Sequence, residues 1–139
     1  MGDGRLILID ANIWAYYFDE SLSEHTSVIR PVEKALTSQK ACVNATVVVE
    51  TLHYLVKRLG PLVGGRKGTI FTSLDIPIFT LDLETIDVTK SKLCAFSHLG
   101  IGGRDATILA SMEIENVPII MTHDQSFKRI PDLHVVDPC

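Results

Sequence analysis

Four acidic side chains stand at points in the sequence where a cation site could form. Asp10 and Asp124 follow the two clearest apolar runs of the chain, and Glu50 and Asp105 lie near the starts of two amphipathic segments. Carboxylates a few ångströms apart repel one another, so some would take up a proton unless a cation neutralised them. Oxygen ligands suit Mg²⁺ or Mn²⁺ better than zinc, so these residues together would form a site for one of those ions.

Each of these acidic residues, taken alone, also has a simpler interpretation. Asp10 can cap the helix that follows it, Glu50 can be an exposed residue favoured by the helix dipole, and Asp124 can belong to a turn. Asp105 is more unusual, because it shares a helix face with apolar residues that should be buried. A carboxylate on that face must cap the helix, pair or bind a metal, and Arg104 faces elsewhere and is a poor partner.

Apolar runs alternate with amphipathic segments along the chain, and these elements must position the acidic residues. Pro31 is expected to break or kink its helix, Gly60-Pro61 to end another, and Gly64-Gly65 to form a hinge before a short helix at 64–73. Strands are expected at residues 6–9, 41–44, 76–80, 117–122 and 134–136, and the other helices at residues 12–18, 23–40, 46–59, 83–99 and from 102 onward.

This alternation predicts an α/β fold with a mostly parallel sheet, formed by one domain over residues 1–139. Ligands of such sheets bind beyond the carboxyl ends of the strands. Asp10 and Asp124 stand at or just past two of these strand ends. The sequence therefore places its site there.

Composition excludes several classes of protein. The chain has 139 residues, of which 46% are hydrophobic, so it can fill a core and is not disordered. Its apolar runs are far shorter than the roughly 20 residues needed to cross a bilayer, and its N-terminus does not resemble a signal peptide. We expect a cytoplasmic protein with no membrane association.

Sulfur and imidazole ligands show no recognisable metal-binding spacing. Cys42, Cys94 and Cys139 are widely separated, so they are interpreted as core or surface thiols. The five histidines show no paired spacing either. His123 stands beside Asp124, but alternation along an extended chain predicts that it points to the opposite side.

Charge gives a mixed indication about nucleic acid. The net charge of −4 counts against simple electrostatic binding. Residues 51–74 contain no acidic residue, however, and their basic side chains form either a phosphate-binding patch or a solvated loop. These basic residues are Lys57, Arg58, Arg66 and Lys67.

The acidic residues and their neighbours resemble those of PIN domains, specifically the VapC-type ribonuclease toxins of toxin–antitoxin pairs. The resemblance covers essentially the whole chain, and it rests on the order and spacing of loose motifs, including the tail around Ile130-Pro131 and residues 135–138. The motifs are Ile-Asp-Ala-Asn at residues 9–12, Val-Val-Glu-Thr at 48–51, Gly-Arg-Asp-Ala at 103–106 and Thr-His-Asp-Gln-Ser-Phe at 122–127.

The resemblance implies a three-layer PIN-like fold and a cleft that binds one or two Mg²⁺ or Mn²⁺ ions. It implies hydrolysis of an RNA phosphodiester by metal-activated water, leaving a 5′-phosphate and a 3′-hydroxyl. Arg104 could hold a phosphate or form a surface salt bridge. Asp10, Glu50, Asp105 and Asp124 match the acidic ligands of the family, and Asn12 and Thr122 match the polar positions that support them.

The resemblance also implies a homodimer and an antitoxin that occludes the cleft. An acidic cleft in a chain of charge −4 suits a basic antitoxin tail, whose arginine would take the place of the metal among the carboxylates. Apolar surface for self-association is expected along residues 23–36 and on an aromatic run. The run consists of Trp14, Tyr16, Tyr17 and Phe18.

Several other protein classes also place acidic residues at strand ends or share this fold. A receiver domain needs a lysine after a late strand, and none directly follows residues 117–122; a haloacid-dehalogenase-type phosphatase needs an aspartate where Asn12 stands. A non-catalytic PIN-like RNA-binding or scaffold protein should lack some of the acids, yet all four are kept. An RNA-processing PIN nuclease without an antitoxin remains open.

Overall fold

The fold is built on a five-stranded, fully parallel sheet with the strand order β3-β2-β1-β4-β5. The computed structural model describes residues 4–139. The strands are β1 (Ile7–Ile9), β2 (Ala41–Asn44), β3 (Ile78–Phe79), β4 (Ile119–Met121) and β5 (His134–Val136). The helices are α1 (Ala11–Phe18), α2 (His25–Thr37), α3 (Ala45–Thr72), α4 (Leu83–Phe96) and α5 (Gly103–Ile114), with short 3₁₀ turns η1 (Ser97–Leu99) and η2 (Phe127–Arg129).

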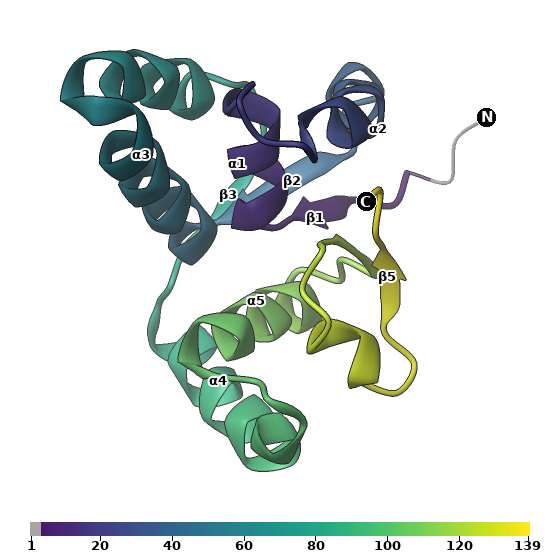
Figure 1. Ribbon diagram of the computed structural model, residues 1–139. Helices are drawn as coiled ribbons and strands as arrows, with labels where there is room; N and C mark the ends of the chain where they lie inside the picture. Colours follow the sequence, from purple (N-terminus) through teal and green to yellow (C-terminus); the bar gives the residue numbers. More distant parts are fainter. Residues whose placement is uncertain (1–3) are drawn as a thin grey trace.

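Helices cover both faces of the sheet and give the molecule three layers (Figure 1). The first three helices lie on one side and α4 and α5 on the other. Leu8, Ile9 and Ile120, in the two central strands, are completely inaccessible to solvent, as expected for strands that are covered on both faces. The predicted α/β fold with a parallel sheet is confirmed, and within residues 4–139 no helix is long and apolar enough to cross a membrane.

Two predictions about helix breaks are wrong. Pro31 lies inside α2, which continues through it to Thr37. The backbone bond that proline cannot donate would go to Ser27, and Ser27 is exposed, so water can bind that carbonyl instead. The predicted hinge at Gly64-Gly65 lies within helix, and the bend is at Gly60, whose φ of 84° and ψ of 165° divide α3 into two arms.

Gly64 is needed where the two arms of α3 meet. A Cβ at this position would lie 2.6 Å from the carbonyl carbon of Leu55 and 2.8 Å from Cα of Val56, which is closer than atoms can pack. A Cβ on the adjacent Gly65 would meet nothing within 4 Å. The paired glycines therefore have different roles, and only Gly64 permits the close approach.

Trp14 and Phe18 of the aromatic run of α1 belong to the core and do not supply the predicted apolar surface, whereas Tyr16 and Tyr17 stay partly exposed. Trp14 is fully buried, and its indole Nε1 donates to the carbonyl oxygen of Ile9 at 3.0 Å. Phe18 and the apolar stripe of α2 are also buried, because α1 packs between α2 and α3. The exposed large apolar side chains lie elsewhere, and they are Val49, Val56, Leu62, Val63, Ile70, Ile78, Leu81, Leu83 and Ile86.

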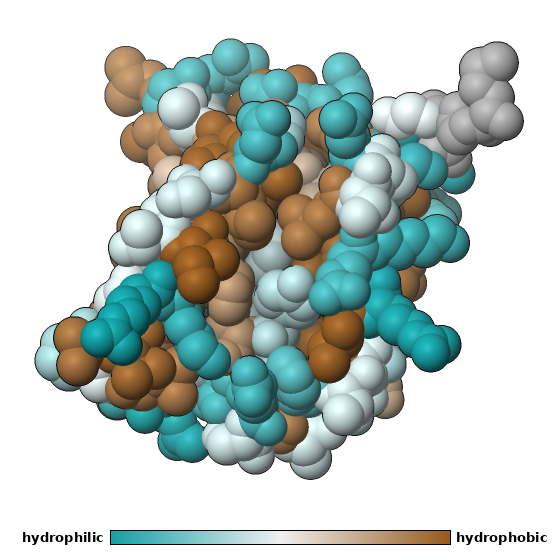
Figure 2. Space-filling model, turned by 90° about the horizontal axis from the view of Figure 1, so that it is seen from above, coloured by the Kyte–Doolittle hydropathy of each residue, from teal (hydrophilic) through white to brown (hydrophobic). Residues whose placement is uncertain are grey.

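Apolar and hydrophilic side chains alternate over the surface formed by the first three helices. Figure 2 views the molecule from that side and shows apolar patches between hydrophilic residues, around a hollow in the middle of the face. On the opposite side of the sheet, α4 packs on α5 and has a single buried residue, Thr85. Its Leu83 and Ile86 are 80% and 56% exposed.

The packing of the two arms can be tested by replacing each glycine with alanine. Gly64→Ala should lower the free energy of unfolding by about 1–3 kcal/mol, because the added methyl group overpacks the contact with Leu55. Gly65→Ala is the matched control, and it should leave stability unchanged or raise it by up to about 1 kcal/mol through helix propensity. Urea denaturation followed by circular dichroism measures both, and equal effects would contradict the assignment.

Candidate active site

Asp10 is held in one orientation at the junction between β1 and α1. Its Oδ1 accepts a hydrogen bond from the backbone N–H of Ala11 at 2.7 Å, and its Oδ2 accepts from the hydroxyl of Thr122 at 2.8 Å. The side chain caps the first turn of α1, and the residue is only 6% exposed. The helix cap and the candidate ligand are therefore the same carboxylate.

Burial makes the ionised form of Asp10 costly. It raises the pKa of Asp10 to about 6, although the hydrogen bonds from Thr122 and Ala11 oppose the shift. The carboxylates of Glu50 and Asp105 raise this pKa further. A nearby cation would have the opposite effect and favour the charged carboxylate.

Thr122 connects the two central strand ends. Its hydroxyl donates to Asp10 and accepts from Nδ2 of Asn12 at 3.4 Å and from the backbone N–H of Asp124 at 3.0 Å. The amide oxygen of Asn12 in turn accepts from the backbone N–H of His123 at 3.3 Å. The structure thus places Asn12 and Thr122 beside Asp10, where the sequence predicted polar support.

Asp105 and Asp124 approach the site from the other side of the sheet's end. Asp105 lies in the first turn of α5 and is partly buried; burial raises its pKa, and the charge of Asp124 adds to the shift. Asp124 follows β4, and its Oδ1 accepts from the backbone N–H of Ser126 at 2.9 Å. The turn interpretation of Asp124 is thereby confirmed, and its charge still acts on Asp105.

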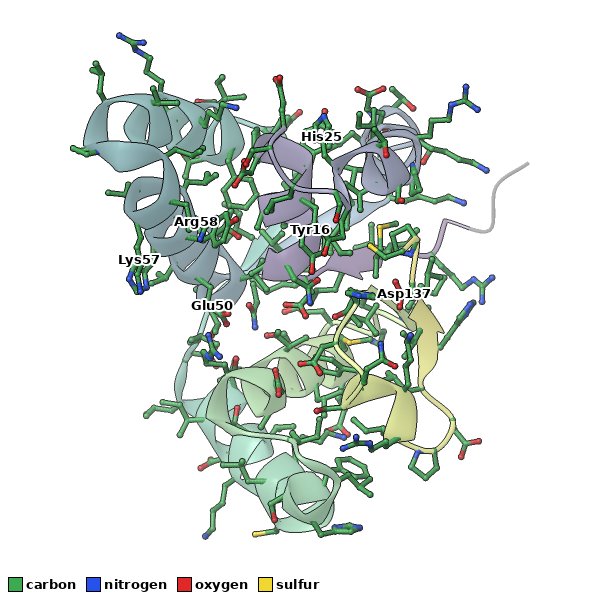
Figure 3. All side chains as sticks on the ribbon, viewed as in Figure 1. Tyr16, His25, Glu50, Lys57, Arg58 and Asp137 are labelled. Atoms are coloured by element: carbon green, nitrogen blue, oxygen red, sulfur yellow. The ribbon has the colours of Figure 1, made fainter. Side chains whose placement is uncertain are left out.

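Glu50 completes the group from α3, and its partner is Arg104. The two side chains form an ion pair of 2.9 Å, in which Arg104 is 74% exposed and Glu50 is 23% exposed. Burial raises the pKa of Glu50, while Arg104 opposes the shift and Asp105 adds to it. Figure 3 shows Glu50 at the end of α3 that approaches the helices on the far side of the sheet.

The four predicted carboxylates therefore lie close enough to influence one another's charge. Asp10 responds to Glu50 and Asp105, and Asp105 responds to Asp124. Among residues 4–139, however, no three of them bring one oxygen each within 4.8 Å of one another. An all-oxygen donor set around one strongly buried carboxylate fits a divalent cation such as Mg²⁺ or Mn²⁺.

A pocket of about 400 Å³ borders this group of carboxylates. Glu50 lies on its wall as predicted, whereas Asp10, Asp105 and Asp124 are not part of its lining. His53 and Tyr54 stand one helical turn after Glu50, so placing Glu50 on a helix could have revealed them. The complete lining is Ala11, Asn12, Ala15, Tyr16, Glu50, His53, Tyr54, Lys57 and Arg104.

The predicted basic patch does not form one surface. Lys57 lines the pocket beside the carboxylates. Arg58 instead lies beside Asp19, and Arg66 is exposed on the second arm of α3. Lys67 donates to the carbonyl oxygen of Phe18 at 2.6 Å, so the expectation that it belongs to the same patch is wrong. The reason is the bend at Gly60, which sends the second arm in another direction.

Replacement of Asp10 by asparagine tests the pKa assignment. The folded pKa of about 6 exceeds the ordinary value of 3.8, so the contribution of Asp10 to wild-type stability should fall as pH rises between these values and stay constant above them. Asp10→Asn lacks this titrating carboxyl group. The free energy of unfolding of the variant, relative to that of wild type, should therefore increase by about 2–3 kcal/mol from about pH 4 to about pH 7. Urea denaturation in EDTA measures the difference.

The control for this measurement is Asp132→Asn, which changes an exposed aspartate whose φ of 63° asparagine also tolerates. Its stability relative to wild type should not vary over the same pH range. A constant difference between wild type and Asp10→Asn would contradict the raised pKa.

Comparisons with known proteins agree with this fold. VapBC from Salmonella typhimurium has a similar structure, with a TM-score of 0.76, 19% identity and coverage of 97% of this chain and 99% of that one. VapBC2 from Rickettsia felis gives a TM-score of 0.75, 20% identity and coverage of 95% and 98%. Mycobacterium tuberculosis VapC20, described as a Sarcin-Ricin loop cleaving toxin, gives 0.68, 16% identity and coverage of 82% and 86%.

A search of curated proteins finds no significant relative by sequence. The sequence does match the PIN domain family over residues 7–133, which includes all four acidic residues of the site. This match and the three-layer parallel fold lead to the same assignment: the chain belongs to the PIN domain family.

Proposed function

We propose that this PIN domain is a divalent-metal-dependent endoribonuclease and the toxin of a VapBC-type toxin–antitoxin pair. The observation that carries the proposal is the buried Asp10 carboxylate, fixed by Ala11 and Thr122 and near the charges of Glu50 and Asp105, of which Asp105 is in turn near Asp124. A helix cap alone does not require other carboxylates near Asp10, and their repulsion makes the ionised form less stable. A cation bound among them would remove this repulsion, which explains why they lie together.

Asp10, Glu50, Asp105 and Asp124 are the residues that would hold Mg²⁺ or Mn²⁺. When bound, such an ion polarises a phosphodiester and lowers the pKa of water. The chain's own residues would orient the reactants, because Thr122 and Asn12 fix Asp10. We infer products with a 5′-phosphate and a 3′-hydroxyl.

The pocket beside the carboxylates is the proposed place for RNA. Lys57 and Arg104 stand on its wall and would attract phosphates, and Tyr16 and Tyr54 offer aromatic rings against which a base can stack. Arg104 already neutralises Glu50, so a phosphate there would compete with this ion pair. These two cations, rather than Lys67, are the proposed RNA contacts.

An antitoxin is the proposed protein partner of the same site. Solved structures of similar fold are VapBC complexes, including two bound to DNA. An arginine from a basic antitoxin tail would satisfy the carboxylates with charge-assisted hydrogen bonds and exclude the metal. This arrangement would keep the ribonuclease inactive in a cytoplasm full of RNA.

A homodimer is also proposed, with its contact away from the surfaces expected from the sequence. The exposed apolar residues include Leu62, Val63 and Ile70 on the second arm of α3, and Leu83 and Ile86 on α4. Burial of such side chains between two copies would be favourable, by about 25 cal/mol for each Å² removed from water. Trp14 and Phe18 of α1 and the apolar stripe of α2 are buried and are not available for it.

Metal-dependent cleavage is the test of the nuclease. Purified protein should cut RNA with Mg²⁺ or Mn²⁺ and stop when EDTA is added, since the carboxylates then lose the ion. Asp10→Asn should lower the cleavage rate at least about 100-fold while the protein stays folded. Asp132→Asn, the same change at an exposed position, should retain activity. Cleavage that persists in EDTA, or in Asp10→Asn, would contradict the assigned site.

Growth of a host cell tests the toxin assignment separately. Expression of the wild-type chain should arrest growth, expression of Asp10→Asn should not, and co-expression with the neighbouring gene should relieve the arrest. Colony counts after induction measure all three. Harmless expression of a protein that cuts RNA well when purified would remove the toxin assignment and favour an RNA-processing nuclease without an antitoxin. A folded protein that binds RNA without cutting it would favour the scaffold function.

A further inference from the structure

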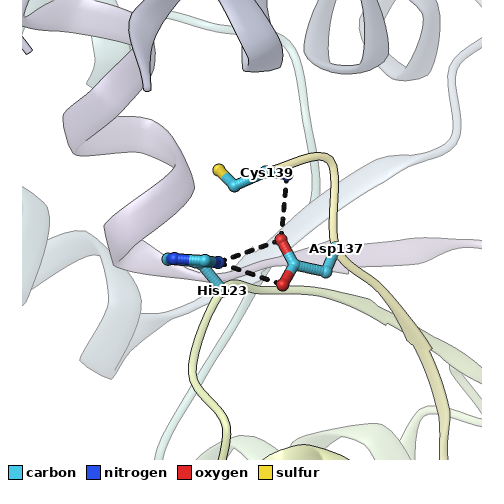
Figure 4. A group of neighbouring side chains, drawn as sticks. All are labelled: His123, Asp137 and Cys139. Atoms are coloured by element: carbon cyan, nitrogen blue, oxygen red, sulfur yellow. Dashed lines mark hydrogen bonds and ion pairs between the residues drawn. The ribbon is translucent and has the colours of Figure 1, made fainter. Parts of the chain in front are cut away.

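A second group of metal-ligating side chains lies where the chain segments after β4 and β5 meet (Figure 4). His123 Nδ1 is 3.0 Å from Oδ2 of Asp137 and 3.1 Å from Oδ1. The backbone N–H of Cys139 donates to Oδ1 of Asp137 at 2.9 Å, which turns the chain back toward the histidine. One ligand atom of each of the three residues lies within 4.8 Å of the other two.

This group differs from the acidic site in chemistry and in position. It combines imidazole, carboxylate and thiol, whereas the acidic site offers oxygen alone. The ring of His123 lies beside Asp137 and packs at 6.2 Å, centroid to centroid, against that of Tyr16. No local spacing indicated this group, because thirteen residues separate His123 from Asp137.

Asp137 is prepared to act as an anionic ligand. Burial alone would raise its pKa, but hydrogen bonds from Lys128 and His123 hold the pKa of Asp137 below its ordinary value. Lys128 Nζ lies 2.6 Å from Oδ2, so the carboxylate already attracts cations. The side chain of Asp137 is 14% exposed and that of His123 is 38% exposed, so an ion can reach both from solvent.

We propose that His123, Asp137 and Cys139 form a binding site for a transition-metal dication of the Zn²⁺ type. Ligands about 2.0–2.3 Å from a tetrahedral zinc ion lie about 3.3–3.8 Å apart, so small side-chain rotations bring these atoms into place. Imidazole and thiolate select such ions over Mg²⁺. The three residues leave the fourth position to water, and Lys128 gives up its contact with Asp137.

A metal at this site would tie the segment after β5 to the one that carries Asp124. His123 would contribute its ring to the ion while its backbone N–H stays with Asn12. The bound metal would thereby restrict motion of the segment that carries Thr122 and Asp124. The site itself does not require the proposed nuclease activity.

Cobalt spectroscopy on the full chain tests the proposal, because thiolate bonded to Co²⁺ gives a near-ultraviolet charge-transfer band that oxygen ligands do not. Titration of the reduced protein with Co²⁺ should produce this band with saturation at one equivalent, and Zn²⁺ should remove it. Cys139→Ser should abolish the band. Cys94→Ser is the matched control, since Cys94 is also an exposed thiol, and it should leave the band unchanged.

Two further variants separate a site from a single reactive thiol. His123→Gln should weaken Co²⁺ binding at least tenfold, whereas Lys128→Ala should strengthen it by removing the competing ammonium group. Circular dichroism establishes that each variant is folded. Absence of the band, its persistence in Cys139→Ser, or equal affinity in His123→Gln would overturn the proposal and leave a hydrogen-bonded ion-pair network.

Discussion

The pair of hydrogen bonds on Asp10 is the interaction on which the rest of this structure depends. One of them starts a helix, and the other joins the ends of two central strands through Thr122. Removing either donor would leave a buried carboxylate oxygen without a hydrogen bond, which is destabilising. Both donors belong to the folded chain and are in place without a ligand. The carboxylate is thus oriented by secondary structure, which is more rigid than a loop.

Helix ends supply the remaining favourable electrostatics. Asp10 caps α1 and Asp105 occupies the first turn of α5, so the positive ends of two helix dipoles face the acidic group. Arg104, beside Asp105 in sequence, pairs with Glu50 of another helix. These contacts offset part of the repulsion between the carboxylates. The pKa of Asp10 stays raised mainly because the residue is buried, and the charges of Glu50 and Asp105 add to the shift.

The sequence predicted local features well and contacts between helices poorly. The runs at residues 41–44 and 134–136 form β2 and β5 with the predicted boundaries, because a short run of strand-forming residues is a local property of the sequence. The cap by Asp10 followed from residue type alone. The Arg104–Glu50 pair and the burial of Trp14 depend on how α3 crosses α5 and α1, which no local pattern encodes. The bend at Gly60, by contrast, lies where Gly60-Pro61 was expected to end a helix. The His123–Asp137 contact was not predicted either, because it joins two segments that come together only when β5 pairs with β4.

The parallel topology also fixes when the site can exist. Asp10 belongs to the first strand, and its hydroxyl donor Thr122 is 112 residues further along the chain. At the usual rates of translation, about 5–20 residues per second, several seconds separate the synthesis of the two halves. Through that interval β1 has no β4 beside it, and Asp10 and Asp124 cannot face a common point. A nascent chain on the ribosome is therefore without its assembled acidic group until nearly the whole domain has emerged.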